Sequence, residues 1–505
     1  MKSSQIKKGA VLSYIALFVN VLIGLLYTPW LISSIGKSDY GLYTLAMSII
    51  GLLAFDFGLS HATTKFITQY LAEGRQDKVD NLLGLMYKLY LFLDGIIFLV
   101  FFVLYFFLPQ IYTGLTSDEL SRFSKVFIIA SLFCVISFPF MPLSGTLSSY
   151  ELFVPLKACD LFNRIFIVVT MSICLIMGYG LFALVLVNSL SGLITIVLKL
   201  IIVRRKTPVK LNIRFWDKQE FRTILMFVIW VTIIALAQRM IFNISPSILG
   251  IFSDSQQIAY LGIAITLESY VFMFANAING LFLPRVSKLL YNNQSSEILD
   301  LMIKVGRVQL YIIGFICVWM VSFGRHFIDV WMGEGYSSVY PCALLIIIPS
   351  FLHLPQEIGH TYIVAANQVR KQSYVYVLMG LLNIVMSIPL SMKFGALGIC
   401  ISIFIAYTVR TAGLDILYYK VLHLDILTFF KKSFFKLTPL LCGILAIAIG
   451  INKVIPVQGW MGLIVKSVLY MAVFVALCWA LGLNSYEKQL FMAPCKKLIS
   501  KIGIK

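Results

Sequence analysis

The chain has 505 residues, of which 60% are hydrophobic and only 12% are charged, and its net charge at pH 7 is +19. A soluble protein of this size could not bury so much apolar surface, so the composition excludes a soluble globular enzyme or binding module. The positive charge does not indicate a nucleic-acid partner, because Lys and Arg cluster in alternate segments between apolar stretches, as expected of cytoplasmic loops.

Apolar stretches of 18 or more residues recur from end to end and predict roughly fourteen membrane-spanning helices. With a cytoplasmic N-terminus, the internal segments and both tails carry about 32 of the 41 basic residues, and the external segments carry about seven. We therefore predict an all-α polytopic membrane protein with both termini in the cytoplasm. The expected spans are 9–33, 40–64, 82–108, 123–149, 157–177, 181–203, 221–250, 257–284, 303–326, 341–366, 371–392, 396–420, 434–452 and 459–482.

The second expected span contains an acid, Asp56, in the run Asp56-Phe57-Gly58-Leu59. It lies roughly 15 residues below the polar turn at 36–39, or about 22 Å of helix, well inside a hydrocarbon core about 30 Å thick. A carboxylate at that depth is a functional candidate. The alternative is a helix irregularity in which Asp56 binds backbone donors near Gly58.

A weak internal repeat relates the first half of the chain to the second. Thr28-Pro29 and its following turn compare with Ser245-Pro246, an offset of 217 residues, and two further pairs of segments have offsets of about 213 and 215. Six spans separate the equivalents, so both copies enter the membrane in the same direction. We predict two parallel-repeat six-helix lobes, residues 1–206 and 207–423, followed by two additional helices and a basic tail, 424–505.

The segments between spans are too short to hold a soluble domain, and no G-x-x-x-x-G-K-[ST] motif or nucleophile–base set is present. The nine cysteines lie mostly within apolar spans without paired spacing. We therefore predict neither an enzyme nor a metal or other cofactor site.

Several runs resemble the oligosaccharide flippases of polysaccharide biosynthesis (O-antigen-type), a family of the multidrug/oligosaccharidyl-lipid/polysaccharide (MOP) superfamily. They are Tyr27-Thr28-Pro29, Tyr40-Gly41-Leu42-Tyr43, Asp56-Phe57-Gly58-Leu59, Phe282-Leu283-Pro284-Arg285 and Gly333-Glu334-Gly335-Tyr336.

The resemblance implies two lobes around a cavity and movement of an undecaprenyl-diphosphate-linked oligosaccharide from the inner to the outer leaflet. The setting would be the bacterial inner membrane, where the product feeds assembly of O-antigen, capsule or exopolysaccharide. The implied partners are the lipid-linked glycan and the bilayer. The polymerase and chain-length proteins of the pathway are further candidate partners.

Such a cargo needs cations and amide donors inside the membrane, since Arg pairs bidentately with phosphate. Arg239 lies near the middle of span 7, with Asn243 one turn on, and we predict that Arg239 faces the phosphate. The alternative is an ion pair of Arg239 with Glu268 or Asp56.

In span 8, Glu268, Asn276 and Asn279 share one stripe, which favours a sugar-facing wall. The alternative is interhelical hydrogen bonding. Asn20 in span 1 suits either a cavity wall or close helix packing.

Span 10 places His353, Glu357 and His360 at i, i+4 and i+7 on one face. A titratable cluster coupled to proton influx is one interpretation, because His changes charge near neutral pH. A buried hydrogen-bonded trio is the other. Asp56 is a further coupling candidate.

Other charged residues are weaker candidates. Arg285 and Lys65 stand at cytoplasmic helix ends, where they would receive the diphosphate at the cytoplasmic entrance or only anchor the helix. Asp160 and Arg164 have the spacing of a structural intrahelical pair. Arg410 and Asp415 rank lower for the site, and Lys466 is expected to snorkel outward.

The leading hypothesis is therefore an ion-coupled flippase that works by alternating access. Three alternatives stay open: a small-molecule or drug antiporter of the same superfamily, a non-transporting membrane subunit of a polysaccharide assembly complex, and, third, an enzyme such as a polymerase.

Overall fold

A computed structural model describes residues 21, 24–53, 55–279, 282–292, 294–366, 368–489 and 492. Every regular element among these residues is helical, as predicted. The α-helices are α2 (Lys37–Leu53), α3 (Leu59–Ala72), α4 (Gln76–Ile111), α5 (Ser117–Ser137), α6 (Pro142–Ser149), α7 (Phe153–Ile176), α8 (Leu181–Lys206), α9 (Lys218–Phe242), α10 (Ile244–Phe252), α11 (Ser255–Asn279), α12 (Leu283–Tyr291), α13 (Ser295–Met332), α14 (Val339–His353), α15 (Glu357–Ala365), α16 (Val369–Phe394), α17 (Ala396–Lys420), α18 (Ile426–Lys432), α19 (Phe434–Val454) and α20 (Gly459–Leu477).

Eleven helical stretches in the described part of the chain are long and apolar enough to cross a membrane. They correspond to expected spans 3–7 and 9–14. Of the other three, span 1 lies mostly outside the described residues, span 2 is divided between α2 and α3, and span 8 is α11 with its buried acid, Glu268. The structure is therefore that of a multi-pass membrane protein, and about fourteen spans fit it.

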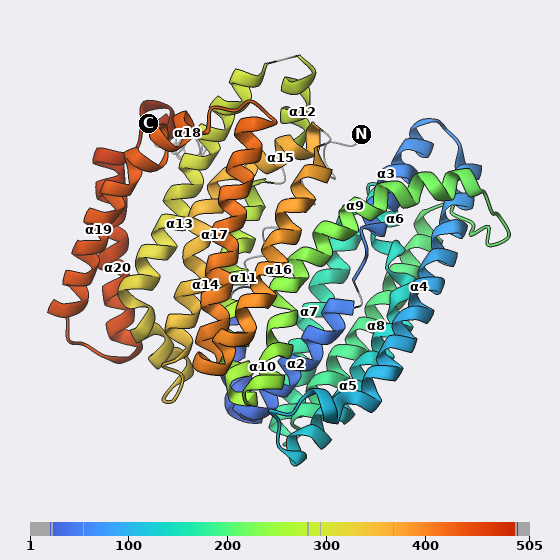
Figure 1. The fold of residues 1–505 in the computed structure, drawn as a ribbon, viewed down its shortest axis with the longest axis horizontal. Helices are drawn as coiled ribbons and strands as arrows, with labels where there is room; N and C mark the ends of the chain where they lie inside the picture. Colours follow the sequence, from blue (N-terminus) through green and yellow to red (C-terminus); the bar gives the residue numbers. More distant parts are fainter. Residues whose placement is uncertain are drawn as a thin grey trace, which may run out of the picture. The chain divides into compact units, whose positions relative to one another are not determined.

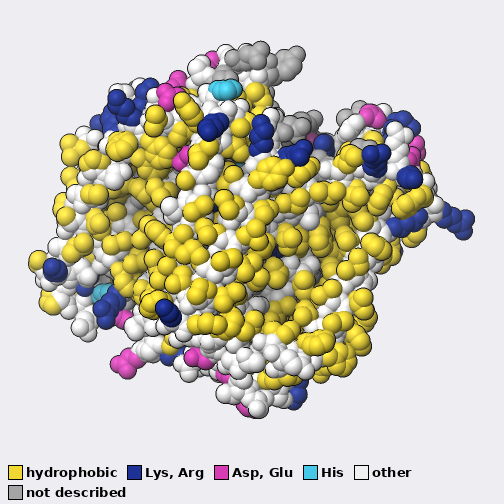
Figure 2. All heavy atoms as spheres, viewed as in Figure 1, with side chains coloured by type: hydrophobic (Ala, Val, Ile, Leu, Met, Phe, Trp, Pro, Cys, Tyr) yellow, Lys and Arg dark blue, Asp and Glu magenta, His cyan; other side chains and the backbone are white. Residues whose placement is uncertain are grey.

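The outward surface of these helices is apolar. On α4, the side chains of Phe98, Phe102 and Phe106 are each more than half exposed. Hydrophobic side chains cover most of the face shown in Figure 2, while many of the Lys and Arg side chains lie toward its edges. Apolar patches of this extent are stable only against lipid.

Two short 3-10 turns, η1 (Phe138–Phe140) and η2 (Leu354–Gln356), interrupt spans 4 and 10. Each contains a proline near its start, Pro139 or Pro355, whose missing N–H and fixed φ favour a break in the α-helical ladder. The turns begin 216 residues apart, within the range of 213–217 residues given by the predicted repeat. These two interruptions fit the predicted repeat, which stays a prediction.

The chain folds into two compact units. Unit 1 is Met1–Gly262 with Ser373–Ala406, and unit 2 is Ile263–Gln372 with Tyr407–Lys505. The units follow the packing within each part of the chain and do not test the predicted lobe boundaries at 206 and 423, which stay a prediction.

Inside unit 1, neighbouring helices are tied by hydroxyl–amide bonds. Ser191 of α8 donates to the side-chain oxygen of Asn163 in α7 at 2.6 Å. Ser402 of α17 likewise donates to Asn383 of α16, at 3.0 Å to the side-chain oxygen and 2.8 Å to the backbone oxygen. Such bonds hold helices together where the bilayer offers no polar partner. The polar side chains of each helix pair therefore have partners within the protein, and their presence in a span does not require a ligand.

Unit 2 is built on α13, a helix of 38 residues. Helices α14, α19 and α20 pack against it (Figure 1). Arg307 of α13 is 3% exposed and binds Glu487, which is 1% exposed, through Nε at 2.5 Å and Nη2 at 3.0 Å. Arg307 also donates to the backbone oxygens of Gly482 and Lys432, at 2.9 and 3.1 Å. One guanidinium therefore joins α13 to α18 and to the segment that follows α20.

The prediction that Lys466 snorkels outward is wrong. Its side chain is buried in α20, and Nζ donates to Asn452 Oδ1 of α19 at 3.0 Å and lies 3.3 Å from His326 Nδ1 of α13. Polar partners on two neighbouring helices are available inside the unit, so the long side chain turns inward and stays there. The sequence shows only that Lys466 lies within an apolar span, and not that Asn452 and His326 lie beside it.

We expect Glu487→Gln to destabilise the protein strongly, because it leaves the Arg307 charge buried without its carboxylate, a loss on the order of 3–5 kcal/mol. The melting temperature of the detergent-solubilised protein should fall by several degrees. Asp77→Asn is the matched control, since it breaks an exposed 3.6 Å pair with Arg75 and should have little effect. Equal melting temperatures for Glu487→Gln and Asp77→Asn would contradict the structural role of the buried pair.

Candidate functional site

The first candidate site is the interruption of the second span. Helix α2 ends at Leu53, α3 begins at Leu59, and Phe57 and Gly58 between them have φ of 51° and 73°. The Asp56 carboxylate accepts hydrogen bonds from the Ser60 backbone N–H at 3.0 and 3.1 Å and from Ser60 Oγ at 2.7 Å. Tyr90 of α4 donates its hydroxyl to the same carboxylate at 2.6 Å. Asp56 thus binds backbone donors at the start of α3, as the helix-irregularity alternative predicted.

Arg239 of α9 supports the other side of the same interruption. Its Nη1 donates to the backbone oxygen of Gly51, in the last turn of α2, and its guanidinium lies 4.9 Å from the centre of the Phe55 ring. Asn243 donates to the Ser48 oxygen at 3.4 Å. The last carbonyls of a helix lack intrahelical donors and carry partial negative charge, so a cation is a favourable partner there. Asp56 is the acid near Arg239, but their charged atoms lie beyond ion-pair distance.

A second intramembrane arginine of unit 1, Arg164 in α7, has different surroundings from those expected. Asp160 pairs with Lys199 at 3.1 Å and with Lys157 at 3.8 Å, so the predicted intrahelical pair with Arg164 is not formed. Arg164 lies instead close enough to the hydroxyls of Tyr27 and Tyr43 to interact electrostatically with them. Its Nε is buried without a hydrogen-bond partner among the described residues. The i, i+4 spacing therefore did not identify the surroundings of either residue.

Unit 2 contains a cluster of buried and half-buried titratable side chains around Arg410 of α17. Arg410 and Glu268 are each 6% exposed, and they are close enough to interact electrostatically. The Arg410 guanidinium stacks over the Tyr407 ring, 4.3 Å from its centre, and the centre of the His353 ring lies 5.4 Å from that of Tyr407. Arg410 also acts electrostatically on Glu357 and His360. The residue that ranked low in the sequence is therefore the centre of this cluster.

The predicted trio of span 10 is only partly brought together. His360 Nδ1 lies 3.2 Å from Glu357 Oε1, so these two are in contact. His353 ends α14 and has its Nδ1 3.1 Å from the Pro349 oxygen, while Glu357 begins α15. The η2 turn separates the two helices, so the trio does not occupy one continuous helical face as predicted. Among the described residues, no group of three or more His, Cys, Asp or Glu side chains is placed to hold a metal ion.

Comparison with known proteins assigns the chain to a family. A family model described as "Polysaccharide biosynthesis protein" matches residues 6–290, more than half of the sequence. The chain belongs to this family. None of the curated protein sequences matches it.

Solved structures share the fold of this polysaccharide biosynthesis protein. "Lipid II flippase MurJ, inward closed conformation" has a TM-score of 0.64 at 14% identity, covering 94% of this chain and 97% of that one. An inward-facing multidrug resistance MATE family transporter of the MOP superfamily also gives 0.64 at 14%, covering 80% and 96%. The MATE multidrug transporter DinF-BH gives 0.63 at 14%, covering 83% and 96%. At 14% identity these comparisons show the fold, which the chain shares with a lipid II flippase and with multidrug transporters.

Several predicted site residues of this family member have no described surroundings. Asn20 and the side chains of Asn276 and Asn279 lie outside the described residues. Lys65 and Arg285 are both exposed, but only Arg285, near the start of α12, is at a helix end as predicted, because Lys65 lies in the middle of α3. Their part in receiving cargo stays a prediction, as do the binding roles of Asp56, Arg239, Asn243 and Glu268.

The two interpretations of Asp56 can be separated with two substitutions. Asp56→Ala removes the acceptor for the Ser60 N–H and should cost on the order of 1–2 kcal/mol, which lowers the melting temperature in detergent. Asp56→Asn keeps an acceptor and should stay close to the parent in stability. If Asp56 also takes part in ion coupling, Asp56→Asn will lose transport while remaining stable. A melting temperature unchanged by Asp56→Ala would contradict the capping role.

Proposed function

We propose that the protein is a flippase that moves an undecaprenyl-diphosphate-linked oligosaccharide from the cytoplasmic to the outer leaflet of the bacterial inner membrane by alternating access. Its product would enter assembly of a cell-surface polysaccharide such as O-antigen, capsule or exopolysaccharide. The observation that carries this proposal is membership of the polysaccharide biosynthesis family combined with arginines in the middle of membrane spans. Both termini would lie in the cytoplasm, and the two predicted lobes would alternate around the cargo.

The arginines of unit 1 support an anionic cargo. An arginine inside the bilayer costs about 2.5–3.5 kcal/mol on insertion scales, so it needs a compensating partner. Arg239 uses one of its N–H donors on the Gly51 oxygen, and a guanidinium has five such donors. Arg164 has two tyrosines beside it and a buried Nε without a partner among the described residues. A diphosphate offers oxygens that match the fork of a guanidinium.

The cluster of unit 2 supports ion coupling. Glu357 and His360 are in contact, and the buried Arg410 interacts electrostatically with both and with Glu268. A proton that binds to one member changes the electrostatic balance of the others, because charges in a low-dielectric interior interact strongly. Such a cluster can link protonation to a change in helix packing between α11, α15 and α17.

A drug antiporter of the same superfamily is the second candidate, and the structural likeness to MATE transporters favours it as strongly as the likeness to a lipid II flippase favours the first. The family membership favours the glycan cargo. A non-transporting subunit of an assembly complex would not need the arginines and the titratable cluster. The polymerase and chain-length proteins of the pathway are proposed partners.

Deletion of the gene distinguishes these candidates. We expect surface glycan to be lost and unpolymerised lipid-linked oligosaccharide to accumulate on the cytoplasmic face, because the cargo can no longer cross the apolar core. The measurement is the sidedness of the accumulated glycan in membrane vesicles. In the same strain, Arg164→Gln should fail to restore glycan, whereas Lys157→Gln, which removes a partly exposed cation two turns earlier on α7, should restore it. Accumulation on the outer face would indicate a polymerase or ligase, and intact glycan with drug sensitivity would indicate an exporter.

Ion coupling is tested in proteoliposomes with and without a pH gradient. We expect the gradient to accelerate transport by the parent protein and to lose that effect in Glu357→Gln, because the amide cannot exchange a proton with His360. Thr361→Ser, one turn on in α15, keeps its hydroxyl and serves as the control. Unchanged gradient dependence in Glu357→Gln would remove this residue from the coupling mechanism.

A further inference from the structure

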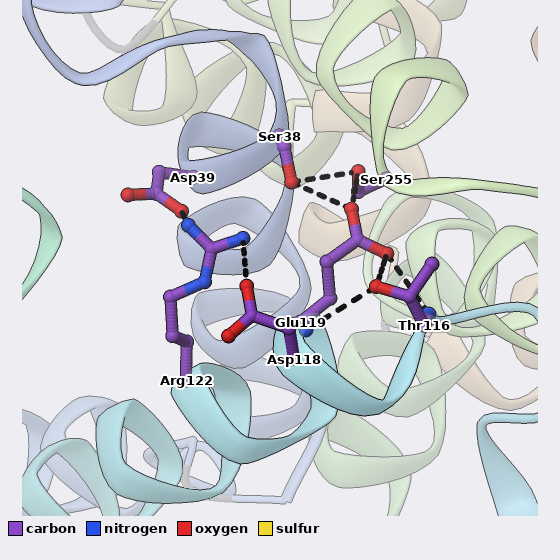
Figure 3. Close-up of polar contacts among 7 residues, drawn as sticks. All are labelled: Ser38, Asp39, Thr116, Asp118, Glu119, Arg122 and Ser255. Carbon is purple, nitrogen blue, oxygen red and sulfur yellow. Dashed lines mark hydrogen bonds and ion pairs between the residues drawn. The ribbon is translucent and has the colours of Figure 1, made fainter.

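Three helix starts of unit 1 meet around a single carboxylate, Glu119 (Figure 3). Ser38 lies in the first turn of α2, Glu119 stands in the first turn of α5, and Ser255 is the first residue of α11. Glu119 Oε1 accepts a hydrogen bond from Ser38 Oγ at 2.6 Å and from Ser255 Oγ at 2.5 Å, and the two hydroxyl oxygens are 3.0 Å apart. The positive ends of three helix dipoles therefore point toward one anion, which favours its charged form at this place.

The other oxygen of Glu119 is held by its own helix. Oε2 accepts from the Thr116 backbone N–H at 3.0 Å and from Thr116 Oγ1 at 3.1 Å, and Thr116 in turn caps the Glu119 N–H at 3.3 Å. This reciprocal capping box fixes the carboxylate at the end of α5. Glu119 is thus presented rigidly, with one oxygen directed at the two serines.

The two serines occupy equivalent positions of the predicted repeat. Ser38 and Ser255 are 217 residues apart, the same offset that separates Thr28-Pro29 from Ser245-Pro246. Ser38 and Glu119 belong to the predicted first lobe, and Ser255 belongs to the second. Glu119 therefore binds the equivalent serine of each predicted repeat. The contact lies at the helix ends that the charge distribution predicts to be external.

Around Glu119 the same elements approach one another at backbone distance. A Cβ added to Gly41 would lie 2.0 Å from the Ser255 oxygen, and one added to Gly114 would lie 2.0 Å from the Ser253 oxygen. Thr113 Oγ1 donates to the Ile251 oxygen at 3.1 Å. Only glycine permits such contact. Helices α2 and α5 and the segment before α5 are therefore closed against the α10–α11 connection, with Glu119 at the contact.

The neighbouring charges do not share this bridging role. Arg122 binds Asp39 at 2.5 Å and Asp118 at 3.2 Å (Figure 3), and all three residues belong to α2 and α5. These pairs hold the first lobe's own helices together. Among the described residues, the bond from Ser255 to Glu119 is the one that joins these three acids to α11.

We propose that Glu119 is a positioning residue of the transport cycle, a latch that holds the predicted external side closed by binding Ser38 and Ser255 and that must release Ser255 when that side opens. This inference rests on the proposed function only in that it requires alternating access. The latch is suited to reversal. When the latch opens, the hydrogen bond between Ser255 and Glu119 breaks and water takes its place on both side chains. Glu119 keeps its bonds to Thr116. No charge is therefore left buried without a partner.

Accessibility of a thiol beneath the contact tests the latch. In a chain whose nine native cysteines are replaced, Ser48→Cys places a single thiol on the buried face of α2, ten residues or ~15 Å of helix from Ser38. The measurement is the rate at which a membrane-impermeant maleimide added outside intact cells labels this cysteine. We expect Glu119→Ala and Ser255→Ala to raise the rate about tenfold or more, the factor that corresponds to a lost hydrogen bond to a charged group.

Asp118→Asn is the matched control, because Asp118 is the preceding residue on the same turn, binds only Arg122 in this cluster and is largely exposed. It should leave the labelling rate at that of the parent. Size-exclusion profiles of the solubilised variants show whether each is folded, and Glu119→Gln, which keeps one oxygen for the serines, should fall between Glu119→Ala and the parent. A labelling rate in folded Glu119→Ala and Ser255→Ala equal to that of Asp118→Asn would overturn the latch.

Labelling needs no cargo, so the latch and the proposed function can fail separately. Faster labelling of Glu119→Ala in a strain whose glycan does not depend on the protein would support the latch and contradict the cargo. Unchanged labelling with glycan that does depend on the protein would contradict the latch alone.

Discussion

The interruption of the second span is the constraint on which unit 1 depends. A helix broken inside the bilayer exposes donors at one new end and acceptors at the other, and lipid can satisfy neither. Each new end has a partner of the appropriate charge. The Asp56 carboxylate accepts a hydrogen bond from the Ser60 N–H at the start of α3, and Arg239 donates to the Gly51 oxygen in the last turn of α2. Thr232 of α9 adds a bond to the Phe57 oxygen at 2.7 Å. The break in span 2 and the polar residues of span 7 are therefore one structural feature, and an apolar α9 would leave the break unsupported.

Two carboxylates in this protein show how surroundings decide whether a polar contact is permanent. Glu487 and Arg307 are both almost fully buried, and the guanidinium also binds backbone oxygens from two other segments. Separating them would leave two charges in an apolar interior, so we expect this pair to stay closed during transport. Glu119 binds neutral hydroxyls at helix ends, keeps its own capping box and is only half-buried. A carboxylate can therefore form a permanent contact, as Glu487 does with Arg307, or a reversible one, as we propose for Glu119 with Ser255.

The sequence contained most of the fold and less of the site. Apolar length and basic loops predicted the spans, since lipid imposes length on every helix. The 3-10 turns that contain Pro139 and Pro355 begin 216 residues apart and fit the predicted repeat. Partners across helices could not be predicted. Lys466 looked like a snorkelling residue until Asn452 and His326 were placed beside it, and Arg410 looked peripheral until α11, α14 and α15 were seen to surround it. Periodicity shows which face a residue occupies, but not which face of another helix it meets.

This distinction bears on where an anionic cargo would first be held. Arg239 was preferred because it stands in mid-span with an amide one turn on, yet both side chains bind carbonyls of the last turns of α2. A phosphate at Arg239 would have to share the guanidinium with a backbone oxygen that the interrupted helix needs, because one of its five N–H donors is already used there. Arg164 carries no such duty: its neighbours are phenols, which can donate to a phosphate rather than compete with it. Under the proposed function, Arg164 is therefore the better first contact for the diphosphate, and Arg239 can offer only the donors that the Gly51 oxygen does not use.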